Sequence, residues 1–339
     1  MGGAFVLGAP GLRRWRRQQA LPMTTVSVPE PPRLSGSTLP DFARRAREMR
    51  ITISPQQMEI SNRLVAPRTG ELLEAARICR RIADGELRAA MAAGETLPGG
   101  KGLDPSIYPI DFCFAICNRV FELLSEMPPV PELCAQGVLW KKIYFIQDSC
   151  FFQNAIQCGD YLLDVAYDTY TPALPPVSCN RLNEVKWEPL NDYRQTGLVA
   201  EQYYRLRLFP NLYFPELFPV APFLALHENG QLNLFWHEHL LFFMDFDENF
   251  PRLRALLDDP KWMGRELPEP HAAHFKNRLT NRFDLPSPVF MRTCTPIELG
   301  NLLDEWNTLR TLPSEPFDAM LIRLDQRLQA TAAWLATAV

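Results

Sequence analysis

The first long segment of the chain has apolar residues at helical spacing. Within residues 70–94 the apolar side chains recur about every 3.6 positions, which predicts an amphipathic helix. The side chains that keep this period are Leu72, Leu73, Ala76, Ile78 and Ile82. Residues 110–127 form a second, more apolar segment that ends at a proline-rich stop. We therefore expect residues 41–130 to be a mainly helical region.

The pattern changes in residues 131–250, where aromatic and β-branched residues dominate short runs separated by turn residues. Such runs are typical of strands. Arg205 and Arg207 alternate with Leu206 and Leu208, which indicates a strand with one face toward solvent. We expect residues 131–250 to be a β-rich region with an irregular antiparallel sheet.

Residues 222–237 carry the clearest local signal, which is that of a hairpin. The Asn229-Gly230 pair between two apolar runs is typical of a type I′ turn, because both central positions of that turn need a positive φ. Such a turn sets His227 opposite Leu232, Glu228 opposite Gln231 and Leu224 opposite Phe235.

Helical spacing returns in residues 251–339, and we expect a helical C-terminal region there. A helical region, then a β-rich region, then a second helical region favour an α+β fold over a doubly wound parallel sheet. The length of residues 41–339 is compatible with one globular unit or with two smaller domains.

Residues 1–40 differ from the rest, and we expect them to be a disordered leader. The first 22 residues contain four arginines and no acidic residue. An organelle transit peptide has this composition. A secretory signal has its charged and apolar parts in the opposite order. A third interpretation, translation that starts at Met23, fits best.

Composition narrows the class of protein. The chain is 47% apolar and 22% charged, which is ordinary for a globular protein. A net charge of −4 argues against a nucleic-acid-binding protein with a basic face, and no apolar run is long enough for a membrane span. The eight cysteines form no C-x-x-C pair, so we expect free thiols and a soluble cytoplasmic protein, or an organelle protein if residues 1–22 are a transit peptide.

All five histidines lie between residues 227 and 274, and this window is the main candidate for chemistry. They are His227, His237, His239, His271 and His274. His237 and His239 share a face if the second hairpin strand continues through them. His271 and His274 are neighbours on a predicted helix. These two pairs are candidate ligands of Zn, Fe or Mn.

Asp245 and Asp247 lie between the two histidine pairs and follow an apolar run. Both are candidate metal ligands and candidate catalytic residues, because two carboxylates on one face can hold Mg²⁺ against phosphates. The competing structural interpretation is that Asp247 or Asn249 caps a helix that begins near Phe250.

No catalytic motif is complete, so the sequence leaves open whether the protein is an enzyme. The leading hypothesis is a non-catalytic binding or assembly protein that contacts a partner protein or itself. The aromatic and proline-rich segment 203–223 and the amphipathic C-terminal helices motivate it. The alternatives are a metal-dependent enzyme with a His/Asp site in residues 227–274, and a Mg-dependent phosphoryl or nucleotidyl transferase built on Asp245 and Asp247.

Overall fold

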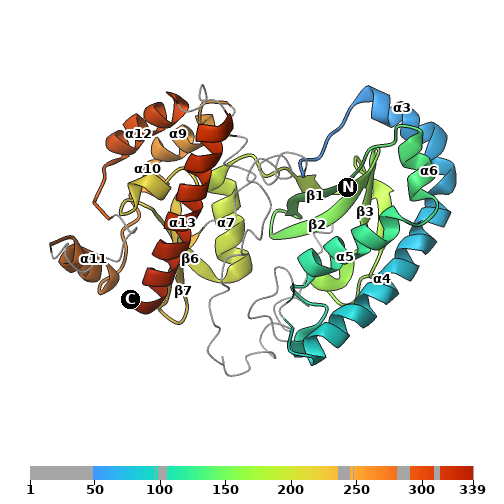
Figure 1. Cartoon of the computed structure of the whole chain (residues 1–339), viewed down its shortest axis with the longest axis horizontal. Coiled ribbons are helices and arrows are strands. Elements are labelled where there is room, and N and C mark those ends of the chain that lie inside the picture. Colours follow the sequence, from blue (N-terminus) through green and yellow to red (C-terminus); the bar gives the residue numbers. More distant parts are fainter. Residues whose placement is uncertain are drawn as a thin grey trace, which may run out of the picture.

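The computed structural model describes residues 49–95, 97, 105–235, 245–246, 248–280, 291–308 and 314–338. The expected leader, residues 1–40 with Met23, lies outside these residues. Helices combine with two antiparallel sheets, which confirms the predicted α+β fold. Figure 1 shows an N-terminal part, up to residue 190, built on one sheet, and a C-terminal part built on the other.

Four helices precede the sheet of the N-terminal part. They are α3 (Pro55–Leu64), α4 (Thr69–Ala92), α5 (Cys113–Ser125) and α6 (Val130–Ala135), with short 3₁₀ turns at Ala66–Arg68 and Pro105–Ile107. The buried stripe of α4 includes Leu72, Ala76 and Ala83. Ile82, expected on that stripe, is 43% exposed. It directly precedes Ala83 and so points about 100° away around the helix.

A five-stranded antiparallel sheet forms the centre of the N-terminal part, with strand order β4-β3-β2-β1-β5. Its strands are β1 (Trp140–Gln147), β2 (Phe151–Cys158), β3 (Tyr161–Asp164), β4 (Ser178–Arg181) and β5 (Trp187–Glu188), and a 3₁₀ turn at Tyr167–Thr169 follows β3. β2 is buried along its whole length. Ile156 packs into the cluster that contains α4 and α5, whereas Ala155 packs against Leu182 on the opposite face. Both faces of the sheet are therefore covered at its centre.

The C-terminal part begins with a helix inside the segment expected to be β-rich. Its elements are α7 (Tyr193–Tyr204), β6 (Leu206–Pro210), a 3₁₀ turn (Pro215–Leu217), β7 (Phe223–His227), β8 (Leu232–Phe235), α9 (Pro251–Leu257), α10 (Pro260–Met263), α11 (His271–Thr280), α12 (Pro296–Thr308) and α13 (Ser314–Ala338). The side chain of Asp192 caps α7. Arg205 ends this helix with a φ of +53° instead of beginning a strand. Among the described helices, none is both long and apolar enough to cross a membrane.

The expected hairpin is present, but its register differs by one residue from the expected one. The backbone N–H of His227 donates to the carbonyl of Gln231 rather than facing Leu232. Gly230 has a φ of +85°, whereas Asn229 does not have a positive φ. A three-residue loop with a left-handed glycine at its end has this geometry. It replaces the two-residue type I′ turn, which shifts every expected pair by one position.

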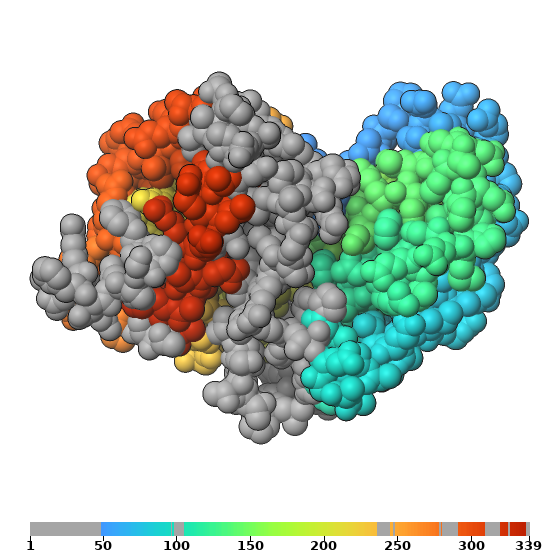
Figure 2. Space-filling view, viewed as in Figure 1, coloured from blue at the N-terminus to red at the C-terminus, as the bar shows by residue number. Residues whose placement is uncertain are grey.

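The aromatic and proline-rich segment 203–223 belongs to the core of the C-terminal part. Phe209, Phe214, Phe218 and Phe223 are all buried in one cluster. α13 contributes Leu321, Leu324, Leu328 and Trp334 to the same cluster, and part of this helix lies on the surface in Figure 2. These apolar side chains pack inward, so they offer little to a partner protein.

Gly197 allows α7 and α10 to pack closely. A Cβ atom at this position would lie 2.7 Å from the ring of Trp262, which is itself 2% exposed. The guanidinium of Arg265 lies 3.7 Å from the centre of that ring and pairs with Glu201 at 2.7 Å. Displacing the Trp262 ring would therefore break these contacts and cost free energy.

We expect Gly197→Ala to lower the free energy of unfolding by about 1–3 kcal/mol, because the added methyl group overpacks the Trp262 contact. Gly85→Ala is the matched control, since a Cβ at that helical position meets nothing within 4 Å, and it should stabilise the protein by about 0.5–1 kcal/mol. Urea denaturation measures both. Equal effects of the two changes would contradict the packing described here.

Candidate functional site

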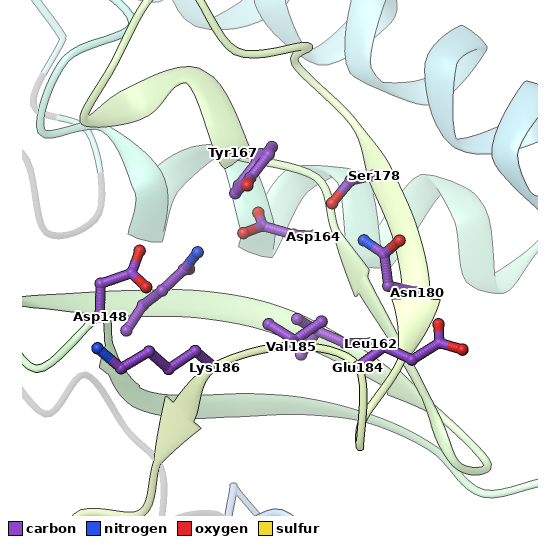
Figure 3. A pocket seen from close by; sticks show the side chains of 10 residues that line it. Asp148, Leu162, Asp164, Tyr167, Ser178, Asn180, Glu184, Val185 and Lys186 are labelled. Carbon is purple, nitrogen blue, oxygen red and sulfur yellow. The ribbon is translucent and has the colours of Figure 1, made fainter. Parts of the chain in front are cut away.

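A polar pocket lies on the face of the five-stranded sheet that is turned away from α4 and α5, and it encloses about 220 Å³ (Figure 3). It is lined by Gln147, Asp148, Leu162, Asp164, Tyr167, Ser178, Asn180, Glu184, Val185 and Lys186. Asp148, Asn180, Glu184 and Lys186 are exposed and form the rim. Gln147, Leu162 and Asp164 are buried and form the floor. We call this site the sheet pocket.

The register of the sheet brings residues of the floor and of the rim together. Asp164 pairs with Ser178, and Leu162 pairs with Asn180. Paired residues in neighbouring strands point to the same face, as do residues two apart in one strand. All four side chains therefore point into the pocket from the ends of β3 and β4.

The turn between β1 and β2 positions the first part of the rim. Asp148 and Ser149 have φ angles of +50° and +56°. Aspartate tolerates this left-handed conformation better than most residues. Figure 3 shows Asp148 and Lys186 at one edge of the pocket, with Asn180 and Glu184 at the opposite edge.

Asp164 is a buried carboxylate, with 1% of its surface exposed. It accepts hydrogen bonds from Nε2 of Gln153 at 2.9 and 3.1 Å and from the backbone N–H of Ala166 at 2.9 Å. Burial nevertheless raises the pKa of Asp164 to about 6, because the charged form loses its hydration. The hydrogen bonds, together with the more distant charge of Arg80, only partly oppose this rise.

Gln147 is the one residue of the sheet pocket with a buried polar atom that lacks a hydrogen-bond donor among the described residues. Its side chain lies at the end of β1, where the residue is 4% exposed, and the atom concerned is Oε1 of the amide. Leaving a buried acceptor unsatisfied costs about 1–3 kcal/mol. A donor from a bound group would recover this energy.

The sheet pocket carries an excess of negative charge. Asp148, Asp164 and Glu184 line it, against a single cationic side chain, Lys186. Charges in a recess interact through less water than charges on an open surface, so their fields are less screened. The pocket therefore favours groups that are positively charged or rich in hydrogen-bond donors.

The histidine window is only partly described. His237, His239 and Asp247 lie outside the described residues. Nε2 of His271 lies 2.8 Å from the carbonyl oxygen of Gly230 at the hairpin loop. The ring of His274 packs near Phe275 and Trp334.

His227 is half-buried at the end of β7, and burial lowers its pKa. Within the part of the chain that the structure describes, no three histidine, cysteine, aspartate or glutamate side chains are placed to hold a metal ion. The metal site proposed for residues 227–274, with Zn, Fe, Mn or Mg, stays a prediction.

Asp245 caps helix α9, a role that the sequence assigned to Asp247 or Asn249. The carboxylate accepts hydrogen bonds from the backbone N–H groups of Arg252 at 2.7 Å and Leu253 at 2.8 Å. Asn249 and Phe250 have φ angles of +69° and +57°. This left-handed turn folds the chain back, so Asp245 reaches the helix end while Asn249 does not. Burial raises the pKa of Asp245 to about 6 in spite of these bonds.

None of the protein-family models, curated proteins or solved structures compared with this chain matches it. The sheet pocket draws its residues from segments 147–148, 162–167 and 178–186, which sequence analysis did not single out. One available signal is that Gln147, Gln153, Gln157 and Asp164 place polar groups on a buried strand face that they share with Ala155 and Leu162. A polar residue at a core position often marks a functional site.

We expect Asp245→Ala to lower the free energy of unfolding by about 1–2 kcal/mol, because α9 loses its cap. Asp245→Asn keeps an acceptor oxygen and should retain much of the stability. Urea denaturation with and without EDTA measures the free energy of unfolding of wild type and of both variants. If EDTA abolishes the difference between wild type and Asp245→Ala, Asp245 acts through a metal rather than as a cap.

We expect the stability difference between wild type and Asp164→Asn to depend on pH. The pKa of Asp164 is raised to about 6 on folding, so the folded protein binds this proton more tightly than the unfolded chain. The tighter binding of this proton stabilises the folded protein fully below about pH 4. That stabilisation is lost as the pH rises through about 6. Wild type should lose about 2–3 kcal/mol relative to the variant between about pH 4 and pH 7. If the difference in free energy of unfolding between wild type and Asp164→Asn stayed constant across this pH range, Asp164 would not be a buried carboxylate with a raised pKa.

Proposed function

We propose that this protein is a non-catalytic binding protein that acts through contact with a partner protein, and that the sheet pocket is the centre of the contact. The observation that carries the proposal is the buried amide oxygen of Gln147, which has no donor among the described residues. Native proteins pair nearly all such atoms. An unpaired acceptor at the floor of a polar recess is ready for a group supplied by another molecule.

The size of the sheet pocket supports an anchor side chain rather than a whole small molecule. Pockets that enclose drug-sized ligands measure about 300–1,000 Å³, and this one encloses about 220 Å³. A recess of this kind suits a single side chain at the centre of a protein interface. Such anchors in desolvated pockets contribute most of the binding energy of many interfaces.

The arrangement of floor and rim also supports recognition. Leu162 on the floor and Val185 offer apolar contacts, while Asp148, Asn180 and Glu184 on the rim offer polar ones. An apolar centre within a polar rim is the usual composition of a protein interface.

The apolar surfaces that first suggested protein contacts do not carry this proposal. The phenylalanines of segment 203–223 and the leucines of α13 are buried in the core of the C-terminal part. The sheet pocket therefore replaces them as the contact site. The two enzyme alternatives use Asp245, Asp247 and, for the metal-dependent enzyme, also His237, His239, His271 and His274. Because His237, His239 and Asp247 lie outside the described residues, both alternatives remain predictions of the sequence.

A photo-crosslinking residue tests the proposal in cells that naturally express the protein. Placed at Asn180 on the rim, it should give a discrete protein adduct. Placed at Glu305, which is exposed on α12 in the other part of the molecule, it should not. Gln147→Leu should reduce the Asn180 adduct at least threefold, because the acceptor is lost while the side chain stays buried.

The adduct is measured by immunoblot and its partner by mass spectrometry. An adduct of twice the mass of the chain would identify a second copy as the partner protein. No adduct from Asn180, or the same adducts from Asn180 and Glu305, would refute the proposed contact.

A further inference from the structure

We propose that the anchor bound in the sheet pocket is the guanidinium group of an arginine side chain on the partner protein. This inference rests on the proposed function and names the chemistry of the same site. It is carried by the juxtaposition of three carboxylates with the unpaired, buried amide oxygen of Gln147. Every one of these groups is an acceptor when the carboxylates are ionised, and a guanidinium is a donor in every direction of its plane.

The acceptors surround the recess instead of lying on one side of it. Asp148 lies at one edge, Glu184 at the opposite edge, and Asp164 lies between them near Tyr167 (Figure 3). A guanidinium has five N–H donors in a fixed fork, whereas an ammonium has three donors at a single point. Acceptors spread around a recess can all be reached by the fork, which favours arginine over lysine.

The lining suits the rest of an arginine side chain as well. Its three methylene groups need apolar contacts, which Leu162 and Val185 offer. The ring of Tyr167, which is only half-buried, offers a face on which a guanidinium can stack. Arginine is also enriched at protein interfaces, while lysine is depleted.

Net charge decides between a cation and a neutral polyhydroxylated ligand such as a sugar. A sugar could also bind carboxylates, amides and a tyrosine ring. It would gain nothing from the excess of two negative charges left when Lys186 offsets one of the three carboxylates. Asp164 in particular is 1% exposed and has no ion pair among the described residues. A cation would compensate this buried charge, and a neutral ligand would not.

The probe for the test is Nα-acetyl-arginine-N-methylamide, which presents the side chain as a peptide does. It is titrated into the full-length protein and followed by NMR and calorimetry. We expect a dissociation constant on the order of 1 mM, as for a single small group. The citrulline analogue has the same shape without the charge and should bind at least tenfold more weakly. The lysine analogue should bind at least threefold more weakly.

Variants of the rim should move the affinity in opposite directions. Asp148→Asn and Glu184→Gln each remove a carboxylate and should weaken binding of the arginine probe about three- to tenfold. Lys186→Met removes the one competing cation and should strengthen it about two- to fivefold. Glu305→Gln, an equal change of charge in the other part of the molecule, should leave it unchanged. Exposed rim residues are tolerant of substitution, so these variants fold even if a floor variant does not.

Several outcomes would overturn the inference. Equal binding of the arginine and citrulline probes, tighter binding of glucose than of the arginine probe, or weaker binding in Lys186→Met would exclude a guanidinium site. Tighter binding of free arginine than of the capped probe would assign the pocket to a free metabolite instead of a protein side chain.

The failure of this inference can be told from the failure of the proposed function. If the arginine probe binds as expected and Asn180 crosslinks no protein, the proposed function is wrong and the chemistry of the pocket is right. If Asn180 crosslinks a partner and the arginine probe does not compete, the partner protein uses another anchor.

Discussion

The burial of strand β2 on both faces is the constraint on which the N-terminal part depends. A strand in that position needs a cover on each side, because its apolar side chains alternate between the two faces. Helices α4 and α5 cover one face. The segment around Leu182 and Trp187 returns across the other face and packs on Phe145 and Ala155. Most of the sheet is sealed in this way.

The sheet pocket exists because the second cover is incomplete. The returning segment packs on Phe145 and Ala155 and leaves a recess beside it that Gln147 and Asp164 line. Gln153 offsets part of the desolvation cost of burying Asp164, since its Nε2 donates hydrogen bonds to both carboxylate oxygens. No donor among the described residues offsets the burial of Oε1 of Gln147 in this way. The recess therefore holds a buried acceptor that no described donor satisfies.

The same physical problem has a different solution at Asp245. That carboxylate is fully buried, and two backbone N–H groups at the start of α9 bind it. Both aspartates have a pKa raised by burial. Asp245 stabilises a helix end inside the core, whereas Asp164 lies on the floor of the sheet pocket. A raised pKa alone therefore does not identify a binding residue, and the surroundings of each carboxylate decide its role.

Local patterns in the sequence determined the class of the fold, the main helices and the existence of the 222–237 hairpin, because helical and strand periodicity report which face of an element is buried. They did not determine the hairpin register. A single backbone φ at Asn229 selects between a two- and a three-residue loop, and both are compatible with the same residues. They also missed α7, which begins at a local aspartate cap and lies among runs with strand-like composition.

The sheet pocket was decided by the tertiary structure alone. Its residues come from three segments separated in the chain by strand β2, turns and a 3₁₀ helix, and the folding of the sheet and of the segment that returns across it brings them together. The clustering of histidines is a more conspicuous pattern in the sequence than the polar residues of the sheet pocket. Closeness along the chain nevertheless says little about closeness in space when the packing is between distant segments. The partner of a charged residue depends on which backbone groups the fold leaves unpaired nearby. For this reason Asp245 became a helix cap and Asp164 became the floor of a pocket.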